Sequence, residues 1–406
     1  MLNKPLTGVK VVDLTYFVAG PGAGRMLADW GADVIKVEPS FGDPGRGTGR
    51  TMTCPANNGA NPFYTTYNAN KRCLSINLKS GEGKKIMDEL LQSANVLLTS
   101  YRTEALKRLG LDYESLEERF PHLIWAQVIG FGTKGPAGNN PGFDTVAFWA
   151  RSGAMLDISE RGSGPINPPI GFGDCSTSSS LAAGICAALY QQAKTGKGQK
   201  VLVSLYGQAI WNMSALVASC QYADEYPKTR KNAVSPVIDS FRCKDGKWIF
   251  LSILEHGRYY NVLVDQVFGR KDLVDDPRYA TSIKGKENAA ELIALLDEEF
   301  AKYTQDEIVE KLTSADIAHE RIQHITDVLD DAQALENYYV SEWRNRDGSF
   351  AKIAATPVQF GAPTIVLEKD APLVGQDSIE VLQELGYGDK DIEALISSGI
   401  VTVTEE

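Results

Sequence analysis

The sequence has few of the features that mark membrane, secreted or metal-binding proteins. Its longest apolar run, residues 181–190, is about half the length that a bilayer-spanning helix needs, and no basic-then-apolar leader precedes it. The six cysteines are scattered with no CxxC pair, which argues against a disulfide framework and a zinc knuckle. We therefore expect an unexported, soluble protein in a reducing cytoplasm.

Histidine and positive charge are also scarce. The four histidines form no HExxH or HxH pattern, so no metal site is predicted. His256, in a glycine-bearing loop, either faces a cleft or lies on the surface. The absence of a GxSxG elbow gives a hydrolase triad little support. A net charge of -11 argues against nucleic-acid or membrane partners, so local cations must hold any anionic ligand.

The 406 residues are enough for two or three domains, and their composition is that of a globular protein. In the first half, short apolar runs alternate with helical patterns, which predicts an α/β fold with a doubly wound, largely parallel sheet. The expected strands are 9–14, 34–37, 74–78, 96–98, 123–129 and 200–205. The expected helices are 24–31, 83–94, 178–194 and 207–222.

A polar, proline-bearing stretch at 227–236 marks a domain boundary. We expect the N-terminal part of a large domain at 1–225, a smaller domain at 226–330, and a return linker with the C-terminal part of the large domain at 331–406. The smaller domain begins with a strand at 248–253. Further helices are expected at 259–268, 286–303, 305–314, 378–385 and 389–398.

Three glycines follow the first predicted strand, in Gly20-Pro21-Gly22-Ala23-Gly24. With Glu38 after the next strand, they resemble a dinucleotide fingerprint. Five residues separate the strand from the first glycine, however, and Pro21 removes an amide donor. A structural turn or another nucleotide-type ligand is therefore favoured over NAD or FAD.

Four cations lie beside predicted strands: Lys71, Arg72, Arg102 and Arg108. Ligands of α/β proteins bind at sheet ends, and phosphates need charge-assisted donors of this kind. The alternative is that these side chains are solvated surface cations.

Gly173-Asp174 precedes the Ser/Thr-rich run 176–180 and an apolar helix. One interpretation of Asp174 is a helix cap. The other is a nucleophile: the helix dipole and free amides would keep the carboxylate ionised, and an ionised carboxylate attacks thioesters. The same amides could stabilise the resulting oxyanion. Gly173 leaves room for close approach.

Several motifs together resemble the family III CoA-transferases, the superfamily of formyl-CoA and carnitine CoA-transferases. They occur in the family's order and spacing over nearly the whole chain: residues 8–15, 19–22, 31–38, 68–72, 173–174, 194–199, 275–279 and 381–386. The resemblance implies a large Rossmann-like domain, an inserted smaller α+β domain and an interlocked homodimer.

The resemblance also implies the chemistry and the binding residues. Asp174 matches the family's nucleophile, which forms a mixed anhydride and then an aspartyl-CoA thioester. The CoA thioester is a substrate, a free carboxylic acid is the other, and no metal or tightly bound cofactor is required. Positions matching CoA contacts are Phe17, Val18, Ala19, Lys71, Leu74, Ser100, Tyr101 and Arg108. Arg72 and Arg102 are added as candidates from their charge alone.

Departures from other branches of the family narrow the expected substrate. Tyr16 and Val18 replace the histidine and glutamine of the formyl-CoA branch, Pro39 replaces its arginine, and residues 252–257 replace its glycine run. These changes argue against formate and oxalate, and favour an apolar acyl group beside Phe17, Val18 and Phe143. Phe143 also stands where α-methylacyl-CoA racemases have a histidine, which argues against racemase activity.

Residues 98–111 and 142–151 look most like the enzymes that move CoA between 2-hydroxy acids and enoyl acids in amino-acid-fermenting anaerobes. Phenyllactate and 2-hydroxyisocaproate are the family's examples. The alternatives are a carnitine-, succinyl- or oxalate-type transferase, an acyl-CoA racemase, a non-catalytic CoA-binding protein and a dinucleotide oxidoreductase. Whether Glu255, Asp144 or His256 assists Asp174 stays open.

Overall fold

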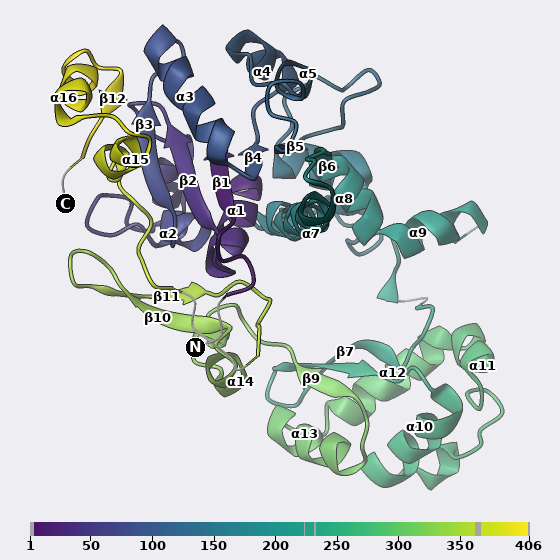
Figure 1. Cartoon of the computed structure of the whole chain (residues 1–406). Coiled ribbons are helices and arrows are strands. Elements are labelled where there is room, and N and C mark those ends of the chain that lie inside the picture. Colours follow the sequence, from purple (N-terminus) through teal and green to yellow (C-terminus); the bar gives the residue numbers. More distant parts are fainter. Residues whose placement is uncertain (1–3, 223, 231–232, 362–366, 405–406) are drawn as a thin grey trace. The chain divides into compact units, whose positions relative to one another are not determined.

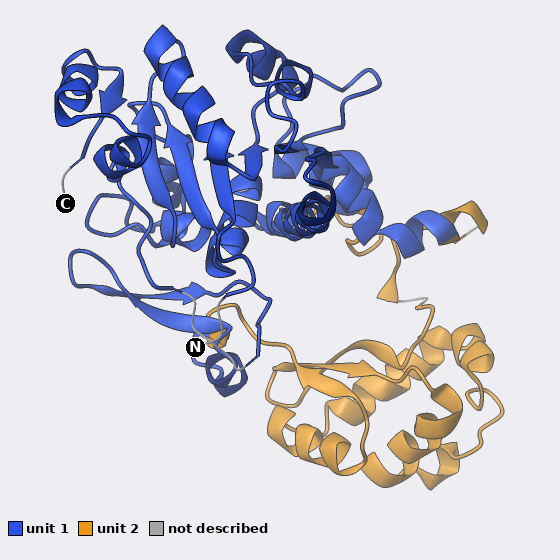
Figure 2. Ribbon diagram, in the orientation of Figure 1, with its two compact units in different colours: residues 1–155, 167–218, 329–406 blue, residues 156–166, 219–328 orange. Residues whose placement is uncertain are grey.

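A computed structural model describes residues 4–222, 224–230, 233–361 and 367–404 (Figure 1). The chain divides into two compact units (Figure 2). The large unit comprises residues 1–155, 167–218 and 329–406, and the small unit comprises 156–166 and 219–328. The divisions at 218/219 and 328/329 lie a few residues before the expected ones. Residues 156–166, expected in the large domain, group with the small unit instead.

A seven-stranded sheet forms the centre of the large unit, with the strand order β12-β3-β2-β1-β4-β5-β6. Its strands are β1 (Lys10–Leu14), β2 (Asp33–Glu38), β3 (Arg72–Ile76), β4 (Val96–Thr99), β5 (Ile124–Ile129), β6 (Lys200–Ser204) and β12 (Val401–Thr402). Strands β1 to β6 are parallel, and β12 runs antiparallel to β3. The prediction of a largely parallel α/β sheet is confirmed, and the order 3-2-1-4-5-6 is that of a Rossmann fold.

Burial on both faces explains why the inner strands are almost continuously apolar. Val11, Val12 and Leu14 of β1 are at most 1% exposed, and the neighbouring strands are equally closed. The helices that cover the sheet include α1 (Ala19–Asp29), α2 (Pro62–Asn68), α3 (Gly81–Ser93), α4 (Thr103–Leu109), α5 (Tyr113–Leu116), α7 (Phe172–Thr195), α8 (Leu205–Asn212), α15 (Ser378–Glu384) and α16 (Asp389–Ser397).

The glycine motif lies inside helix α1, which begins at Ala19 rather than at the expected residue 24. Its glycines permit close packing. A Cβ on Gly22 would lie 2.5 Å from Ser178 Oγ of α7, and one on Gly24 would lie 2.7 Å from Asp13 Oδ2 of β1. The expectation of a turn was therefore wrong, because these glycines let α1 approach α7 and the sheet.

Helix α7 begins at Phe172, six residues before the expected start. Gly171 precedes it with a φ of 77°, which glycine adopts without strain. Ser178 Oγ donates to Ala19 O at 2.7 Å and joins α7 to the start of α1. Asp174 is consequently the third helical residue and not a cap before the helix.

The small unit has a three-stranded antiparallel sheet of the order β7-β8-β9. Its elements include β7 (Ile238–Arg242), β8 (Trp248–Ser252), β9 (His319–Arg321), α10 (His256–Val262), α11 (Ser282–Glu287), α12 (Ala289–Phe300) and α13 (Gln305–Ser314). The remaining α-helices and strands are α6 (Ala154–Asp157), α9 (Ser214–Ser219), α14 (Ala332–Glu336) and the hairpin of β10 (Val340–Arg344) and β11 (Phe350–Ala354). Every helix in the described part of the chain is too short or too polar to cross a bilayer.

Candidate active site

A pocket lies in the large unit at the carboxyl ends of β1, β4 and β5. The strand order reverses between β1 and β4, so this is the topological switch point at which open α/β sheets bind ligands. Its lining consists of Tyr16, Phe17, Val18, Ala19, Gly20, Ser100, Arg102, Thr103, Val128, Ile129, Gly130, Gly138, Asn140, Gly142, Phe143, Asp174 and Leu205. The fold thus brings five of the predicted CoA-contact residues to the same pocket as Asp174.

Asp174 is half-buried in this pocket. No described residue donates a hydrogen bond to its carboxylate. Burial, together with the neighbouring charge of Asp144, raises the pKa of Asp174 to about 7. We expected the helix terminus to favour the ionised form, and that expectation was wrong, because burial and a second carboxylate outweigh the helix dipole.

Asp144 opens a short helical segment, Asp144–Ala150, and its side chain lies beneath the first turn of α7. The residue is only 6% exposed, and within the described chain neither carboxylate oxygen has a partner at hydrogen-bonding geometry. Burial raises the pKa of Asp144 to about 6, although the N–H groups of Gly171, Gly173 and Asp174 act in the opposite direction. These amides are therefore close enough to Asp144 to act on its pKa, and their role as oxyanion donors stays a prediction.

Gly173 makes this arrangement possible. A Cβ at this position would lie 2.2 Å from Asp144 Oδ1 and 2.4 Å from Phe148 Cγ, which no side chain permits. The close approach predicted for Gly173 is therefore made by Asp144 and Phe148 of the protein itself.

Aromatic rings form one wall of the pocket. Phe17 has a φ of 64°, an uncommon conformation for a large side chain, and its N–H donates to Asp43 Oδ1 at 3.1 Å. Its ring contacts Tyr16 at 5.3 Å and Phe143 at 5.6 Å between centroids, and Tyr16 in turn contacts Tyr101 at 5.5 Å. Phe143 is 52% exposed and offers apolar surface to a ligand.

Part of the pocket lining is polar. Ser100 Oγ accepts the Tyr16 N–H at 3.0 Å. Arg102, the residue before α4, is exposed and has no ion-pair partner among the described residues. Arg108, in the last turn of α4, is also exposed but does not line the pocket. The pocket lining therefore presents Arg102 as a cation available to an anionic ligand.

Lys71, Arg72 and Leu74 lie elsewhere. The Lys71 side chain has no exposed surface, pairs with Asp13 at 2.8 Å and donates to Pro21 O and Asn68 Oδ1. Burial lowers the pKa of Lys71 to about 8, against the attraction of Asp13. Leu74 is fully buried in the sheet core.

Arg72 pairs with Asp33 and with Glu380 and Glu384 of α15. The sequence suggested a ligand site here, but Lys71 directly precedes β3 and Arg72 is its first residue. Ligands of parallel sheets bind at the carboxyl ends of strands, and these two residues lie at the amino end.

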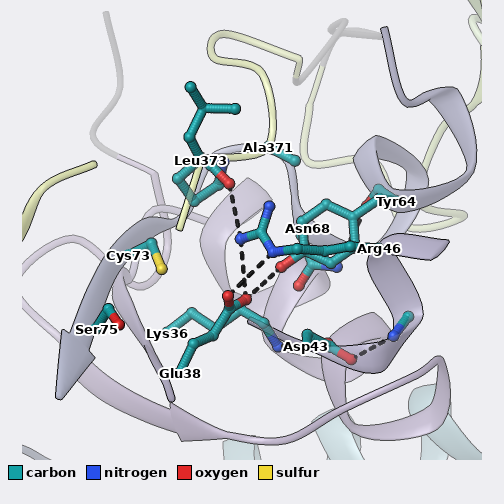
Figure 3. Close-up of polar contacts among 12 residues, drawn as sticks. Lys36, Glu38, Asp43, Arg46, Tyr64, Asn68, Cys73, Ser75, Ala371 and Leu373 are labelled. Carbon is teal, nitrogen blue, oxygen red and sulfur yellow. Dashed lines mark hydrogen bonds and ion pairs between the residues drawn. The ribbon is translucent and has the colours of Figure 1, made fainter. Parts of the chain in front are cut away.

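A buried polar layer that the sequence reasoning missed supports the Thr15–Phe17 loop. Lys36 has no exposed side-chain surface, pairs with Asp43 at 3.0 Å and donates to Thr15 O at 2.8 Å. Next to it, Glu38 accepts both a bidentate pair from Arg46 at 3.0 Å and the Tyr64 hydroxyl at 2.6 Å (Figure 3). A lysine between Ile35 and Val37 in an apolar strand was the available signal.

His256 is neither in a loop nor on the surface. It begins α10 in the small unit, is 7% exposed, and its Nε2 lies 2.6 Å from Tyr279 O while its ring stacks on Tyr260. Glu255 beside it is exposed. In the described chain, no three His, Cys, Asp or Glu side chains gather closely enough to hold a metal.

Comparison with known proteins identifies the class. The model of CoA-transferase family III matches residues 6–378. The chain therefore belongs to CoA-transferase family III, whose members are enzymes that use CoA thioesters as substrates.

Two curated relatives are similar over nearly their full lengths. The (R)-2-hydroxy-4-methylpentanoate CoA-transferase of Clostridioides difficile is 38% identical over 98% of this chain and 99% of the relative. The cinnamoyl-CoA:phenyllactate CoA-transferase of Clostridium sporogenes is 37% identical over 98% of both. Among solved structures, a CaiB/BaiF family protein from Brucella suis superimposes with a TM-score of 0.79 at 27% identity, covering 94% of this chain and 100% of that one.

Proposed function

We propose that this enzyme transfers CoA between 2-hydroxy acids and enoyl or related carboxylic acids, with Asp174 as the nucleophile. The observation that carries the proposal is a half-buried carboxylate without a hydrogen-bond donor, lining a pocket at the switch point of a family III fold. The names of the two similar transferases support the choice of substrate class.

The reaction begins when the Asp174 carboxylate attacks the thioester carbonyl of an acyl-CoA. The C–S bond breaks, giving a mixed anhydride and CoA thiolate. The thiolate then attacks the aspartyl carbonyl, which releases the first acid as its carboxylate and leaves an aspartyl-CoA thioester. An incoming carboxylate repeats the two steps in reverse and departs as the new acyl-CoA.

The pKa of about 7 suits Asp174 to this role. At neutral pH about half of the groups are ionised, and the ionised form is more basic than an ordinary aspartate. Nucleophilic attack generally improves with basicity, so the buried pair gives a stronger nucleophile without a metal or a base.

CoA is expected to bind along the carboxyl ends of the strands, over Phe17, Val18, Ala19 and Ser100. Arg102 and Arg108 would donate hydrogen bonds to its phosphates. A second, mostly apolar pocket at the ends of β1 and β2 is lined by Tyr16, Pro39, Phe41 and Tyr101, among others, and suits a nucleobase.

The acyl group is expected to be apolar. The wall of Phe17, Val18 and Phe143 offers rings and methyl groups, and Arg102 is the one cation that lines the pocket in the described structure. A dicarboxylate such as succinate or oxalate would need a second cation for its distal charge. This argues for a branched or aromatic side chain on the transferred acid.

A homodimer is also proposed, of the interlocked kind that the family resemblance implies. The large unit exposes apolar side chains along α8 and α9, where Ile210 is 38%, Trp211 73% and Val217 43% exposed. Monomeric proteins rarely leave a patch of this kind uncovered, and a second copy of the chain would cover it.

Trapping tests the nucleophile directly. The protein is incubated with an acyl-CoA and then with hydroxylamine or borohydride, and peptide mapping is expected to find Asp174 modified. Asp174→Ala should abolish exchange of label between free acids and acyl-CoA, while Asp391→Asn, an exposed aspartate on α16, should not. Full turnover by Asp174→Ala would refute the assignment. Label exchange measured with a panel of 2-hydroxy, enoyl and dicarboxylic acids then tests the substrate class.

A further inference from the structure

Each carbonyl addition at Asp174 places negative charge on an oxygen, and such sites need preorganised donors. The backbone amides at the start of α7 are one set of candidates, although the N–H groups of Gly171, Gly173 and Asp174 also act on the pKa of the buried Asp144. A side-chain hydroxyl from another element would add a donor that does not face Asp144.

Helix α2 brings a phenol to this place. The hydroxyl of Tyr67 lies 3.8 Å from Sγ of Cys175, the residue after Asp174. It also lies beside the backbone of Gly171, because a Cβ there would be 3.5 Å from both Tyr67 Oη and Val18 Cγ1. The Tyr67 ring packs edge-on against the Phe63 ring, with 5.4 Å between the ring centroids. Tyr67 is thus positioned from α2 against the start of α7, next to Val18 of the pocket wall.

The Tyr67 hydroxyl is protonated and, within the described chain, has only a weak hydrogen-bond acceptor beside it. Burial raises its pKa far above the ordinary value of 10, and the nearby Cys175, Asp174 and Asp144 act in the same direction, so the group stays protonated. Its one partner among the described residues is the thiol of Cys175, and sulfur is a weak acceptor. A stronger acceptor placed at Asp174 would attract this hydrogen bond.

We propose that Tyr67 donates a hydrogen bond to the acyl carbonyl oxygen under attack at Asp174. As the bond from Asp174 to the carbonyl carbon forms, the C=O electron pair moves to the oxygen, and the Tyr67 O–H stabilises it without giving up its proton. The pair returns when the C–S bond breaks and CoA thiolate leaves. This role rests on the proposed function, because it requires an acyl group on Asp174.

The test is Tyr67→Phe, which keeps the ring and its contact with Phe63. The control is Tyr190→Phe, which removes a hydroxyl from α7 at a side chain that is 65% exposed. Loss of one oxyanion donor lowers kcat by about 100-fold or more. We expect a fall of this order in Tyr67→Phe, with the dissociation constant for acyl-CoA and the melting temperature within about twofold and a few degrees of wild type. Tyr190→Phe should match wild type in all three.

Unchanged kcat in Tyr67→Phe would overturn the inference while leaving Asp174 chemistry intact. A joint loss of kcat, binding and melting temperature would show a structural role and also overturn it. If wild-type protein moves no CoA, the proposed function itself fails. Should Tyr67→Phe not fold, 3-fluorotyrosine at position 67 replaces it: its more acidic hydroxyl must change kcat without changing binding, and an unchanged kcat contradicts the proposal.

Discussion

Replacing Asp144 by asparagine should shift the pH dependence of the enzyme, because Asp144 is one of the two causes of the high pKa of Asp174. Asparagine has nearly the same shape and removes the charge. The attraction of a proton to Asp174 then weakens, so its pKa falls. It stays above 3.8, since burial, the larger cause, is unchanged.

The magnitude follows from the pKa of about 7. If only ionised Asp174 attacks, wild-type kcat/KM at pH 6 is about one tenth of its plateau above pH 8. Asp144→Asn should keep a clearly larger fraction at pH 6, and its profile should have a lower midpoint. The wild-type midpoint belongs to the coupled pair, whereas the variant titrates as a single carboxyl group.

The same substitution should stabilise the fold at high pH. The pKa of Asp144 is about 6 in the folded protein against 3.8 for the unfolded group. The destabilisation of the folded protein by ionised Asp144 is therefore absent well below pH 3.8, grows from there to about pH 6 and is complete above it. The difference between the two pKa values, at about 1.36 kcal/mol per unit, corresponds to about 3 kcal/mol in the free energy of unfolding.

Two measurements check these expectations. Initial rates of label transfer from acyl-CoA between pH 5 and about 9 give the kinetic midpoint, and urea unfolding at pH 4 and pH 8 gives the stability difference. Asp391→Asn is the control for removing one negative charge. A midpoint in Asp144→Asn at or above that of wild type, or equal stability effects at both pH values, would refute the coupling of Asp144 to Asp174.

Two further substitutions test the packing around the site. Gly173→Ala puts a methyl group where Asp144 and Phe148 lie, so we expect a lower melting temperature and slower labelling of Asp174 by acyl-CoA. Gly81→Ala, whose Cβ would have open space around it, should change neither quantity. Lys71→Met leaves Asp13 buried without its ion-pair partner and should cost about 3–5 kcal/mol in urea unfolding. Arg72→Met, whose carboxylate partners are more exposed, should cost about 1 kcal/mol. Equal losses for Lys71→Met and Arg72→Met would contradict the structural assignment of Lys71.

The local pattern of the chain predicted the secondary structure well where burial is uniform. The strands β1, β2, β4 and β5 lie within a few residues of the apolar runs that predicted them, because strands covered on both faces are largely apolar. Helix starts were less predictable. Both α1 and α7 begin earlier than expected, because close helix packing at Gly22 and Ser178 extends them beyond the apolar pattern.

The sequence by itself determined the parallel sheet and the helix that carries Asp174, which follow from the order of apolar runs. It also indicated Arg102 as a cation beside a strand, where ligands of α/β proteins bind. Phe17 and Ser100 were indicated only by the family resemblance. Only the tertiary structure decided what surrounds the nucleophile. Asp144 and Tyr67 come from segments far along the chain, the latter 108 residues from Cys175, and no local pattern encodes such a distance. The burial of Asp174 and the charge of Asp144, rather than the helix dipole, set the protonation of Asp174, because removing water from a carboxylate outweighs the weak field of a helix end.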